Sequence, residues 1–187
     1  MKKFPIIILL CIATMALLAS CLNDVKTKVD TSWRDANLAY YTQQSNLKNT
    51  DGTNFYQTII APWDNNAQVL MHWFNDRDLT KDNLKPLYTS TVDLKYKLTL
   101  YDGTALDSSF RRTSPADSIF RTKLNMGVIT GWSIAVTQMH VGDSCRVVIP
   151  YTQGYGMSDY QQVKAYSTLV FDIKLVDIPA YEGKKPQ

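Results

Sequence analysis

The residue in this sequence with the clearest capacity for specific chemistry is Trp132, which directly follows Gly131. A glycine allows its backbone to approach a neighbouring element closely, and an indole beside it can form the floor of a cavity. Few polar groups accompany the apolar and aromatic residues that could line such a cavity: Asp107, Arg112 and the hydroxyl of Tyr155. A mostly apolar lining with sparse polar groups is typical of a small-ligand site. The same residue types are also typical of a hydrophobic core, and by themselves they favour that interpretation over a site.

Other kinds of chemistry find little support. His72 and His140 each lack a second ligand at metal-binding spacing, and the chain has no glycine-rich phosphate loop. Cys145 lies in an alternating apolar stretch and is interpreted as a packing residue rather than a nucleophile. We therefore predict no metal and no cofactor. The formal net charge of +3 drops to +1 without Lys2 and Lys3, and this argues against a nucleic-acid partner.

The elements that must position these residues are mostly strands. Residues 91–100 alternate, with Val92, Leu94, Tyr96, Leu98 and Leu100 on one face and polar residues on the other. Asp102-Gly103 then predicts a hairpin, and 143–149 and 168–176 are further strands. Only 133–138 in this half is typical of a helix. The pattern predicts an α+β fold with an antiparallel sheet that has this helix on one face.

The preceding part of the chain divides into several segments. Thr31-Ser32 can cap a helix that runs from about Trp33 to Leu47. A turn is expected at 49–52, followed by strand-like runs at 55–60 and 68–74. Residues 62–66 are expected to form the loop that separates these runs.

The first 21 residues are typical of an export signal. A short positive segment precedes about fifteen almost wholly apolar residues, which is shorter than the roughly 20 needed to span a bilayer. The ending Leu18-Ala19-Ser20-Cys21 is similar to the lipid-modification motif of bacterial lipoproteins, which would make Cys21 an acylated residue. The alternative is an ordinary signal peptide with an incidental cysteine.

Residues 92–178 resemble the FKBP-type peptidyl-prolyl cis-trans isomerases. Each shared motif is weak by itself, but their order and spacing together are specific. In chain order they are Val92-Asp93-Leu94-Lys95-Tyr96, Asp102-Gly103-Thr104, Leu106-Asp107-Ser108-Ser109, Val128-Ile129-Thr130-Gly131-Trp132, Gln138-Met139-His140-Val141-Gly142-Asp143, Ile149-Pro150, Gly154-Tyr155-Gly156 and Thr168-Leu169-Val170-Phe171-Asp172-Ile173.

This resemblance implies an FKBP-like twisted antiparallel sheet wrapped around one short helix, with an apolar pocket between them and an N-terminal helical extension. It favours the pocket over the core interpretation. The activity it implies is rotation of X-Pro amide bonds in proline-containing segments or unfolded envelope proteins. It implies catalytic roles for Asp107, Ile129, Trp132 and Tyr155, with Arg112 as the ion-pair partner of Asp107. Its implied substrate-binding residues are Tyr96, Leu106, Arg112, Val128, Val163 and Phe171.

The chain also departs from the family pattern. Leu106 and Ala116 stand where aromatic residues are usual, a short insertion occupies 117–126, and the flap at 157–166 lacks the usual prolines. These differences predict a wider or weaker pocket, with an activity that is retained but can be reduced. The alternatives are a catalytically weak FKBP-like peptide-binding or chaperone module, and a structural lipoprotein that keeps only the fold.

The expected organisation is a signal peptide at 1–20, a lipidated cysteine and tether at 21–31, an N-terminal helix at 32–49, an FKBP-like domain at 50–178 and a flexible tail at 179–187. We expect a lipid-anchored protein of the bacterial cell envelope, with the outer membrane favoured and the periplasmic or surface-facing side left open. A homodimer through residues 32–49 is a further expectation.

Overall fold

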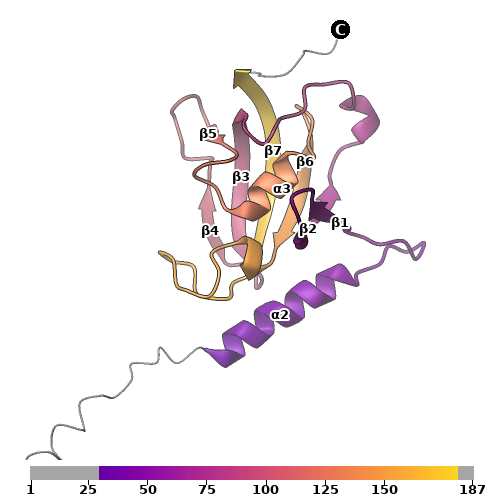
Figure 1. Cartoon of the computed structure of the whole chain (residues 1–187), viewed down its shortest axis with the longest axis vertical. Coiled ribbons are helices and arrows are strands. Elements are labelled where there is room, and N and C mark those ends of the chain that lie inside the picture. The colour runs from indigo at the N-terminus through magenta and orange to yellow at the C-terminus, as the bar shows by residue number, and fades with distance from the viewer. Residues whose placement is uncertain (1–29, 181–187) are drawn as a thin grey trace, which may run out of the picture. The chain divides into compact units, whose positions relative to one another are not determined.

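In the computed structural model shown in Figure 1, the described part of the chain is residues 30–180. The expected signal peptide at 1–20, the expected lipidation site Cys21 and the end of the expected tail lie outside these residues. Within residues 30–180, no helix is long and apolar enough to cross a membrane.

Antiparallel strands in one sheet dominate the described residues. The strands are β1 (Gln57–Ala61), β2 (Asp64–Trp73), β3 (Thr91–Leu100), β4 (Ala105–Ser108), β5 (Phe120–Lys123), β6 (Ser144–Ile149) and β7 (Leu169–Ala180). Their order is β1-β2-β6-β7-β3-β4, and β5 also pairs with β3. Two α-helices and two short 3-10 turns complete the fold: α2 (Thr31–Ser45), α3 (Thr130–Val136), η2 (Arg77–Leu79) and η3 (Tyr151–Gln153). The predicted α+β class is confirmed.

The alternation predicted for residues 91–100 is confirmed in β3, where the five apolar side chains are all buried. Asp93 is the exception on the opposite face because it is also buried, at 7% exposed. The Arg121 guanidinium from β5 donates two hydrogen bonds to its carboxylate, at 2.6 and 2.7 Å. A bidentate pair of this kind compensates the desolvation of a partly buried charge.

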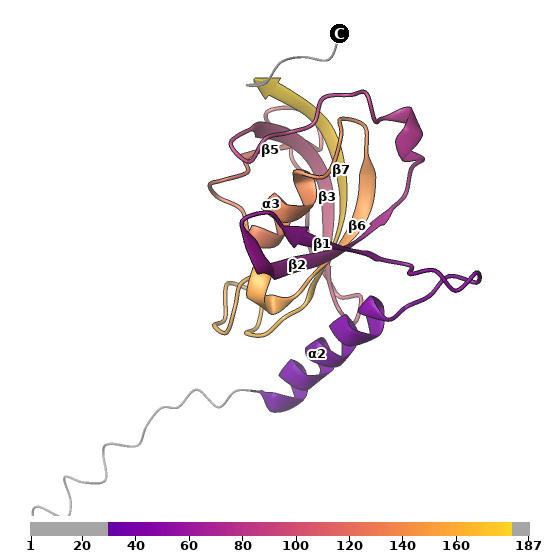
Figure 2. The ribbon, with the colours of Figure 1, turned by 45° about the vertical axis from the view of Figure 1, so that its right-hand side comes forward.

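Helix α3 lies across one face of the sheet, as Figures 1 and 2 show. Residues 131–136 of α3 are all buried, and the core on this side joins them to inward-facing residues of the central strands. A Cβ atom at Gly131 would lie 2.4 Å from a side-chain carbon of Ile149 on β6. Only glycine permits this approach of helix to strand, which agrees with the close contact expected at this position.

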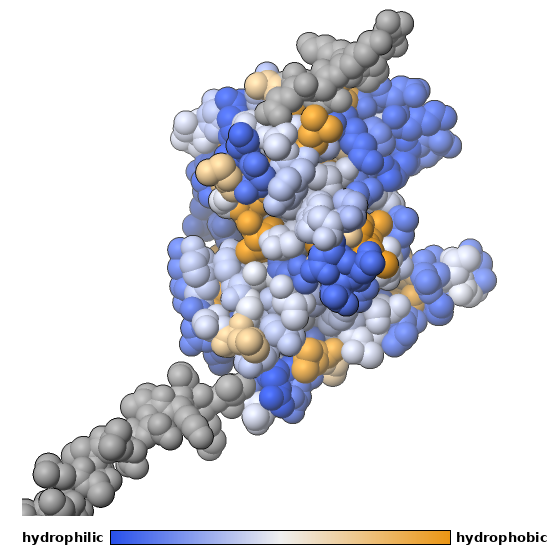
Figure 3. All heavy atoms as spheres, viewed as in Figure 1, coloured by the Kyte–Doolittle hydropathy of each residue, from blue (hydrophilic) through white to orange (hydrophobic). Residues whose placement is uncertain are grey.

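Helix α2 contributes to a second apolar cluster, built on strand residues that point away from α3. Tyr40 and Tyr41 pack with Tyr56, Leu70 and Val148, whose neighbours along β2 and β6 belong to the larger core. Because successive strand side chains point to opposite faces, the two clusters lie on opposite sides of the sheet. On the face drawn in Figure 3, hydrophobic residues are scattered among hydrophilic ones.

The attachment of α2 to the rest of the fold depends on Asn37, whose side chain is fully buried. Its amide oxygen accepts a hydrogen bond from the backbone N–H of Thr168 at 2.7 Å, and its Nδ2 donates to the carbonyl of Trp33 at 2.8 Å. The Thr168 hydroxyl donates to the carbonyl of Asn37 at 3.0 Å. Nearby, the Trp33 indole N–H donates to the Ser167 hydroxyl at 3.2 Å. These bonds connect α2 to the start of β7.

Several predicted boundaries are wrong for local reasons. Helix α2 ends at Ser45, two residues early, because the side chains of Ser45 and Asn46 both donate to the carbonyl of Thr42 and compete with the helical pattern. Strand β2 begins at Asp64, inside the loop expected at 62–66, since Ala61 already pairs with Asp64 across a tight turn.

The positions of the short elements near the pocket also differ from the prediction. Helix α3 spans Thr130–Val136 rather than 133–138, because Ile129 has extended backbone and the first helical turn tolerates Gly131. Strand β4 completes the hairpin predicted at Asp102-Gly103, whereas the four-residue strand β5 was not expected, and β7 extends beyond residue 176 to Ala180. Strands of four residues carry too few alternating positions for the pattern to indicate them.

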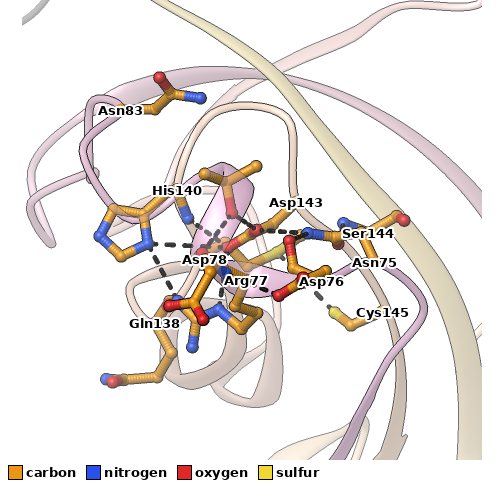
Figure 4. Close-up of polar contacts among 12 residues, drawn as sticks. Asn75, Asp76, Arg77, Asp78, Asn83, Gln138, His140, Asp143, Ser144 and Cys145 are labelled. Carbon is orange, nitrogen blue, oxygen red and sulfur yellow. Dashed lines mark hydrogen bonds and ion pairs between the residues drawn. The ribbon is translucent and has the colours of Figure 1, made fainter.

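A buried carboxylate, Asp143, holds the loop around η2 against the turn between α3 and β6 (Figure 4). It accepts hydrogen bonds from the Thr80 hydroxyl at 2.5 Å, from the Asn75 side chain at 3.0 Å and from the backbone N–H of His140 at 2.7 Å. Arg77 forms an ion pair with it, with Nε at 3.4 Å from Oδ2. Arg77 also stacks over Trp73, with Cζ 3.9 Å from the ring centroid.

His140 belongs to the same network as an acceptor. Nη2 of Arg77 lies 2.9 Å from its Nδ1, and because a guanidinium can only donate, Nδ1 must be unprotonated in this contact. Burial lowers the pKa of His140, the charges of Arg77 and Lys85 lower it further, and Asp143 opposes the shift. The native structure therefore favours neutral His140.

This network predicts a pH-dependent stability. Because the pKa of His140 is below its ordinary value of about 6.5 in the folded chain, the unfolded chain binds the proton more readily. The contribution of His140 to the free energy of unfolding should be complete above about pH 6.5 and should decrease as the pH falls below that value. Urea unfolding of the wild type and of His140→Gln between pH 5 and 8 measures it. The two pH profiles should diverge below pH 6.5, and parallel profiles would contradict the prediction.

Candidate active site

The floor of the candidate site is the indole of Trp132, which is 4% exposed. Three aromatic rings surround it in edge-on contact: Tyr96 at 5.1 Å between centroids, Phe171 at 5.2 Å and Phe120 at 5.8 Å. Edge-to-face packing of this kind is favourable beyond the area it buries and restricts the indole to one orientation. The Nε1 atom of Trp132 is buried and has no hydrogen-bond partner among residues 30–180.

Above this floor lies a cavity of about 460 Å³. Residues of β3, β4, β5, α3, β7 and the loops beside them line it: Tyr96, Leu98, Asp107, Arg112, Phe120, Gly127, Val128, Ile129, Trp132, Tyr155, Tyr160 and Phe171. The volume is in the range of small-molecule sites, and the lining is apolar and aromatic with a few polar groups. The hollow expected between the helix and the sheet is therefore present.

Asp107 is the carboxylate at the edge of this cavity. Its Oδ2 accepts a hydrogen bond from the Tyr96 hydroxyl at 2.5 Å, and its Oδ1 accepts from the backbone N–H of Ser108 at 2.7 Å. Burial raises the pKa of Tyr96 to about 12, and the hydrogen bond to Asp107 contributes in the same direction. Tyr96 is thus a protonated donor at neutral pH. The arrangement lets Asp107 orient the tyrosine ring that supports Trp132.

The Tyr155 ring is stacked on that of Tyr160, with centroids 4.6 Å apart and planes 8° from parallel. Burial raises the pKa of Tyr155, with smaller contributions from Tyr160 and Asp107, so its hydroxyl remains a donor at neutral pH. Within residues 30–180 that hydroxyl makes no hydrogen bond. Tyr160 and Val163 exchange two backbone hydrogen bonds, at 2.8 and 2.9 Å, which close a turn within the flap although it lacks the usual prolines.

Ile129 supplies a backbone donor at the start of α3. Its backbone is extended, with φ −67° and ψ 151°, and it lines the cavity. Its N–H donates to no other group within residues 30–180, whereas most amides at this depth are paired. This amide is therefore available to a carbonyl oxygen of a bound molecule.

Most of the predicted site residues line the cavity, but two of them do not. Leu106 lines a neighbouring depression rather than this cavity. Val163 is 7% exposed and belongs to the hydrophobic core. The lining residues that the sequence did not indicate are Leu98, Phe120, Gly127 and Tyr160. The period-two pattern of residues 91–100 had already placed Leu98 on the buried face with Tyr96, and this signal could have identified it.

The ion pair expected between Asp107 and Arg112 is not formed among the described residues. The Arg112 guanidinium instead lies over the ring of Phe120, with Cζ 4.7 Å from its centroid. Since Tyr96 and the Ser108 amide already satisfy Asp107, the arginine serves as a wall of the cavity. Within residues 30–180, no group of three or more His, Cys, Asp or Glu side chains is placed to hold a metal ion.

The fold and cavity define a class of protein: an antiparallel sheet wrapped around a short helix, with a preformed apolar pocket whose lining residues include no Ser, Thr, Cys or Lys nucleophile. Comparison with known families gives that class its name. The family model for FKBP-type peptidyl-prolyl cis-trans isomerases matches residues 83–176, which is half of the chain. The chain belongs to this family.

Related sequences agree with this membership. The FKBP-type isomerase FkpA of Escherichia coli K12 is 37% identical over 93 residues, which cover 50% of this chain and 33% of that protein. FK506-binding protein 2 of Aspergillus oryzae is 35% identical over 96 residues, which cover 50% of this chain and 69% of that protein. The match thus spans about a third of the length of FkpA.

Solved structures with the same fold cover more of the chain. The crystal structure of FkpA from Escherichia coli covers 88% of this chain and 69% of that chain, with a TM-score of 0.63 and 22% identity. A peptidyl-prolyl isomerase from Pseudomonas syringae covers 79% of this chain and 93% of that chain, with a TM-score of 0.59 and 23% identity. These likenesses confirm the FKBP-like fold.

Phe120 gives a test of how the floor is supported. Phe120→Ala should lower the free energy of unfolding by about 2–3 kcal/mol, somewhat less than a fully buried Phe→Ala change, because the ring is half-buried against Tyr96 and Trp132. Phe110→Ala is the matched control, since that ring is 61% exposed and its loss should change stability by less than about 0.5 kcal/mol. Urea unfolding followed by circular dichroism measures both. Equal losses in the two variants would contradict this account of the floor.

Proposed function

We propose that this protein is a peptidyl-prolyl cis-trans isomerase that binds a proline ring on Trp132. The observation that carries the proposal is the aromatic enclosure of that indole beneath an open, apolar cavity. Family membership and the cavity support the same function by independent routes, one through sequence motifs and the other through geometry.

The chemistry requires a shaped environment rather than a nucleophile. Rotation about the X-Pro bond is opposed by a barrier of about 18–20 kcal/mol, because the C–N bond has partial double-bond character. The planar amide is charge-separated and well solvated in water, whereas the twisted amide has lost this resonance. An apolar pocket that removes water from the planar form and fits the twisted form lowers the barrier.

The polar groups of the cavity then have distinct proposed roles. The free N–H of Ile129 holds one carbonyl oxygen of the substrate, and the Tyr155 hydroxyl holds another. Asp107 accepts a hydrogen bond from the Tyr96 hydroxyl and so keeps in place the ring that supports Trp132. An orienting role suits Asp107 better than contact with the twisting carbonyl, since a carboxylate repels a carbonyl oxygen.

An isomerisation assay on matched variants tests this function. The protein should accelerate cis-to-trans conversion of an X-Pro peptide. Trp132→Leu should reduce kcat/KM by about ten- to a hundredfold through the lost apolar contact. Tyr155→Phe should reduce it by about two- to tenfold through one lost hydrogen bond. Tyr88→Phe, which removes a tyrosine hydroxyl outside the cavity, is the control and should keep full activity.

The outcomes separate the enzyme from a binding module. The wild type could bind the peptide without accelerating isomerisation above the uncatalysed rate, and Trp132→Leu could abolish that binding. This outcome would identify a catalytically weak peptide-binding or chaperone module instead of an enzyme. The position of Leu106 outside the cavity and the lack of the usual prolines in the flap at 157–166 are the features that favour this second function. Full activity in Trp132→Leu would remove the pocket from the mechanism altogether.

We further propose that the protein acts in the bacterial envelope, anchored through acylated Cys21. This proposal depends on the sequence Leu18-Ala19-Ser20-Cys21 after an apolar run, which lies outside the described residues. Each methylene of an acyl chain buried in the bilayer contributes about 0.8 kcal/mol, so several chains hold the protein firmly. A homodimer through residues 32–49 would have to use the exposed side of α2, since its aromatic side packs on the domain.

Metabolic labelling with a fatty-acid analogue tests the anchor in the full chain. The wild type should incorporate the label and sediment with membranes, whereas Cys21→Ser should do neither. Cys145→Ser is the control, because Cys145 is a free and fully buried thiol that should not be acylated. Membrane association of Cys21→Ser at the wild-type level would contradict the proposed anchor.

A further inference from the structure

A second depression of about 560 Å³ lies beside the aromatic cavity. It spans β4 and the start of the loop that follows, and it shares Asp107 and Arg112 with the lining of the cavity. A peptide that places a proline on Trp132 therefore has a neighbouring hollow within reach of the residues that flank the proline.

The depression carries an excess of positive charge. Lys97, Arg111 and Arg112 line it, and none of the three forms an ion pair within residues 30–180. The one carboxylate in the lining, Asp107, is already engaged by the Tyr96 hydroxyl and the Ser108 amide.

A nearby carboxylate does not cancel this charge. Asp172 is the β7 residue paired with Lys97, but its two oxygens accept hydrogen bonds from Arg146 at 2.7 and 2.8 Å. Since Arg146 neutralises Asp172, the charge of Lys97 remains available to a ligand.

The rest of the lining fits the body of a side chain. Leu106 is half-buried there and Phe110 is 61% exposed, so the wall offers apolar contact beside the cations. Arg112 is held at the shared rim by its position over Phe120. A short side chain with an apolar stem and a carboxylate at its end complements this combination.

We propose that this depression is a specificity site that binds an Asp or Glu side chain near the proline of the substrate. The inference depends on the proposed isomerase function, because the acidic residue reaches the depression only when the proline occupies the cavity. The attraction is between exposed charges and is therefore weak, and ions screen it beyond about 10 Å at 0.1 M salt. The site therefore selects among X-Pro sequences rather than determining whether they react.

Matched peptides with Glu or Gln two residues before the proline, and a second pair with the change two residues after it, test the proposal. The cis-trans exchange of each peptide is followed by nuclear magnetic resonance with the full chain. In at least one pair kcat/KM for the Glu peptide should exceed that for the Gln peptide by about two- to fivefold at low salt. The preference should fall toward unity at 1 M salt, where the screening length is about 3 Å.

Variants distinguish the depression from general charge effects. The double variant Lys97→Gln and Arg111→Gln should abolish the preference while leaving the Gln peptides at the wild-type rate, because neither residue lines the aromatic cavity. Lys85→Gln, which removes an exposed cation outside the depression, should retain the preference.

The outcomes for this site and for the isomerase function are separable. Turnover of all four peptides with equal kcat/KM in each pair, or a preference that survives the double variant, would overturn the acidic site and leave the isomerase intact. Absence of turnover for every peptide would instead contradict the proposed function. The affinities of the same peptides, from tryptophan fluorescence titration, would then still test the site, since equal affinity for Glu and Gln would overturn it.

Discussion

The contact between Gly131 and Ile149 is the constraint on which the candidate site depends. A Cβ atom at position 131 would lie 2.4 Å from the Ile149 side chain, so any other residue would move the helix away from the sheet. Because Trp132 is the next residue, the same contact sets how deeply the indole is buried. The rings of Tyr96, Phe120 and Phe171 can enclose the indole only at that depth.

The two faces of the sheet pack against different elements. The face under α3 contains the large core and the cavity, so its packing determines the shape of the site. The opposite face is covered by part of α2, which is connected through buried Asn37 to Thr168, the residue directly before β7. Since β7 also carries Phe171, the extension helix supports a strand that contributes to the cavity. The helix is thus a structural part of the domain, whatever else it contacts.

The two positions where the family usually has aromatic residues show that a pocket cannot be predicted fully from matching motifs. Leu106 and Ala116 predicted a wider or weaker cavity, but Leu106, which was itself predicted to line the cavity, lies outside it. Yet Phe120, from the unexpected strand β5, reaches the floor and also stacks under Arg112. The strand that carries Phe120 pairs with β3 beyond the end of β4, and the start of the loop between β4 and β5 lines the depression beside the cavity. Spacing along the chain does not reveal how such a loop closes.

The sequence by itself determined the fold class and the antiparallel strands, and its resemblance to a known family indicated Trp132, Ile129, Tyr155 and Tyr96, which line the cavity. These features follow from signals that are local in the chain: period-two alternation, glycine at a close approach and short ordered motifs. Only the tertiary structure decided which rings enclose the indole, that Val163 joins the core and that Arg112 lies over Phe120 instead of pairing with Asp107. Those outcomes depend on strand register and loop closure, which bring residues distant in sequence into the same space. Local sequence patterns do not predict which of these residues make contact.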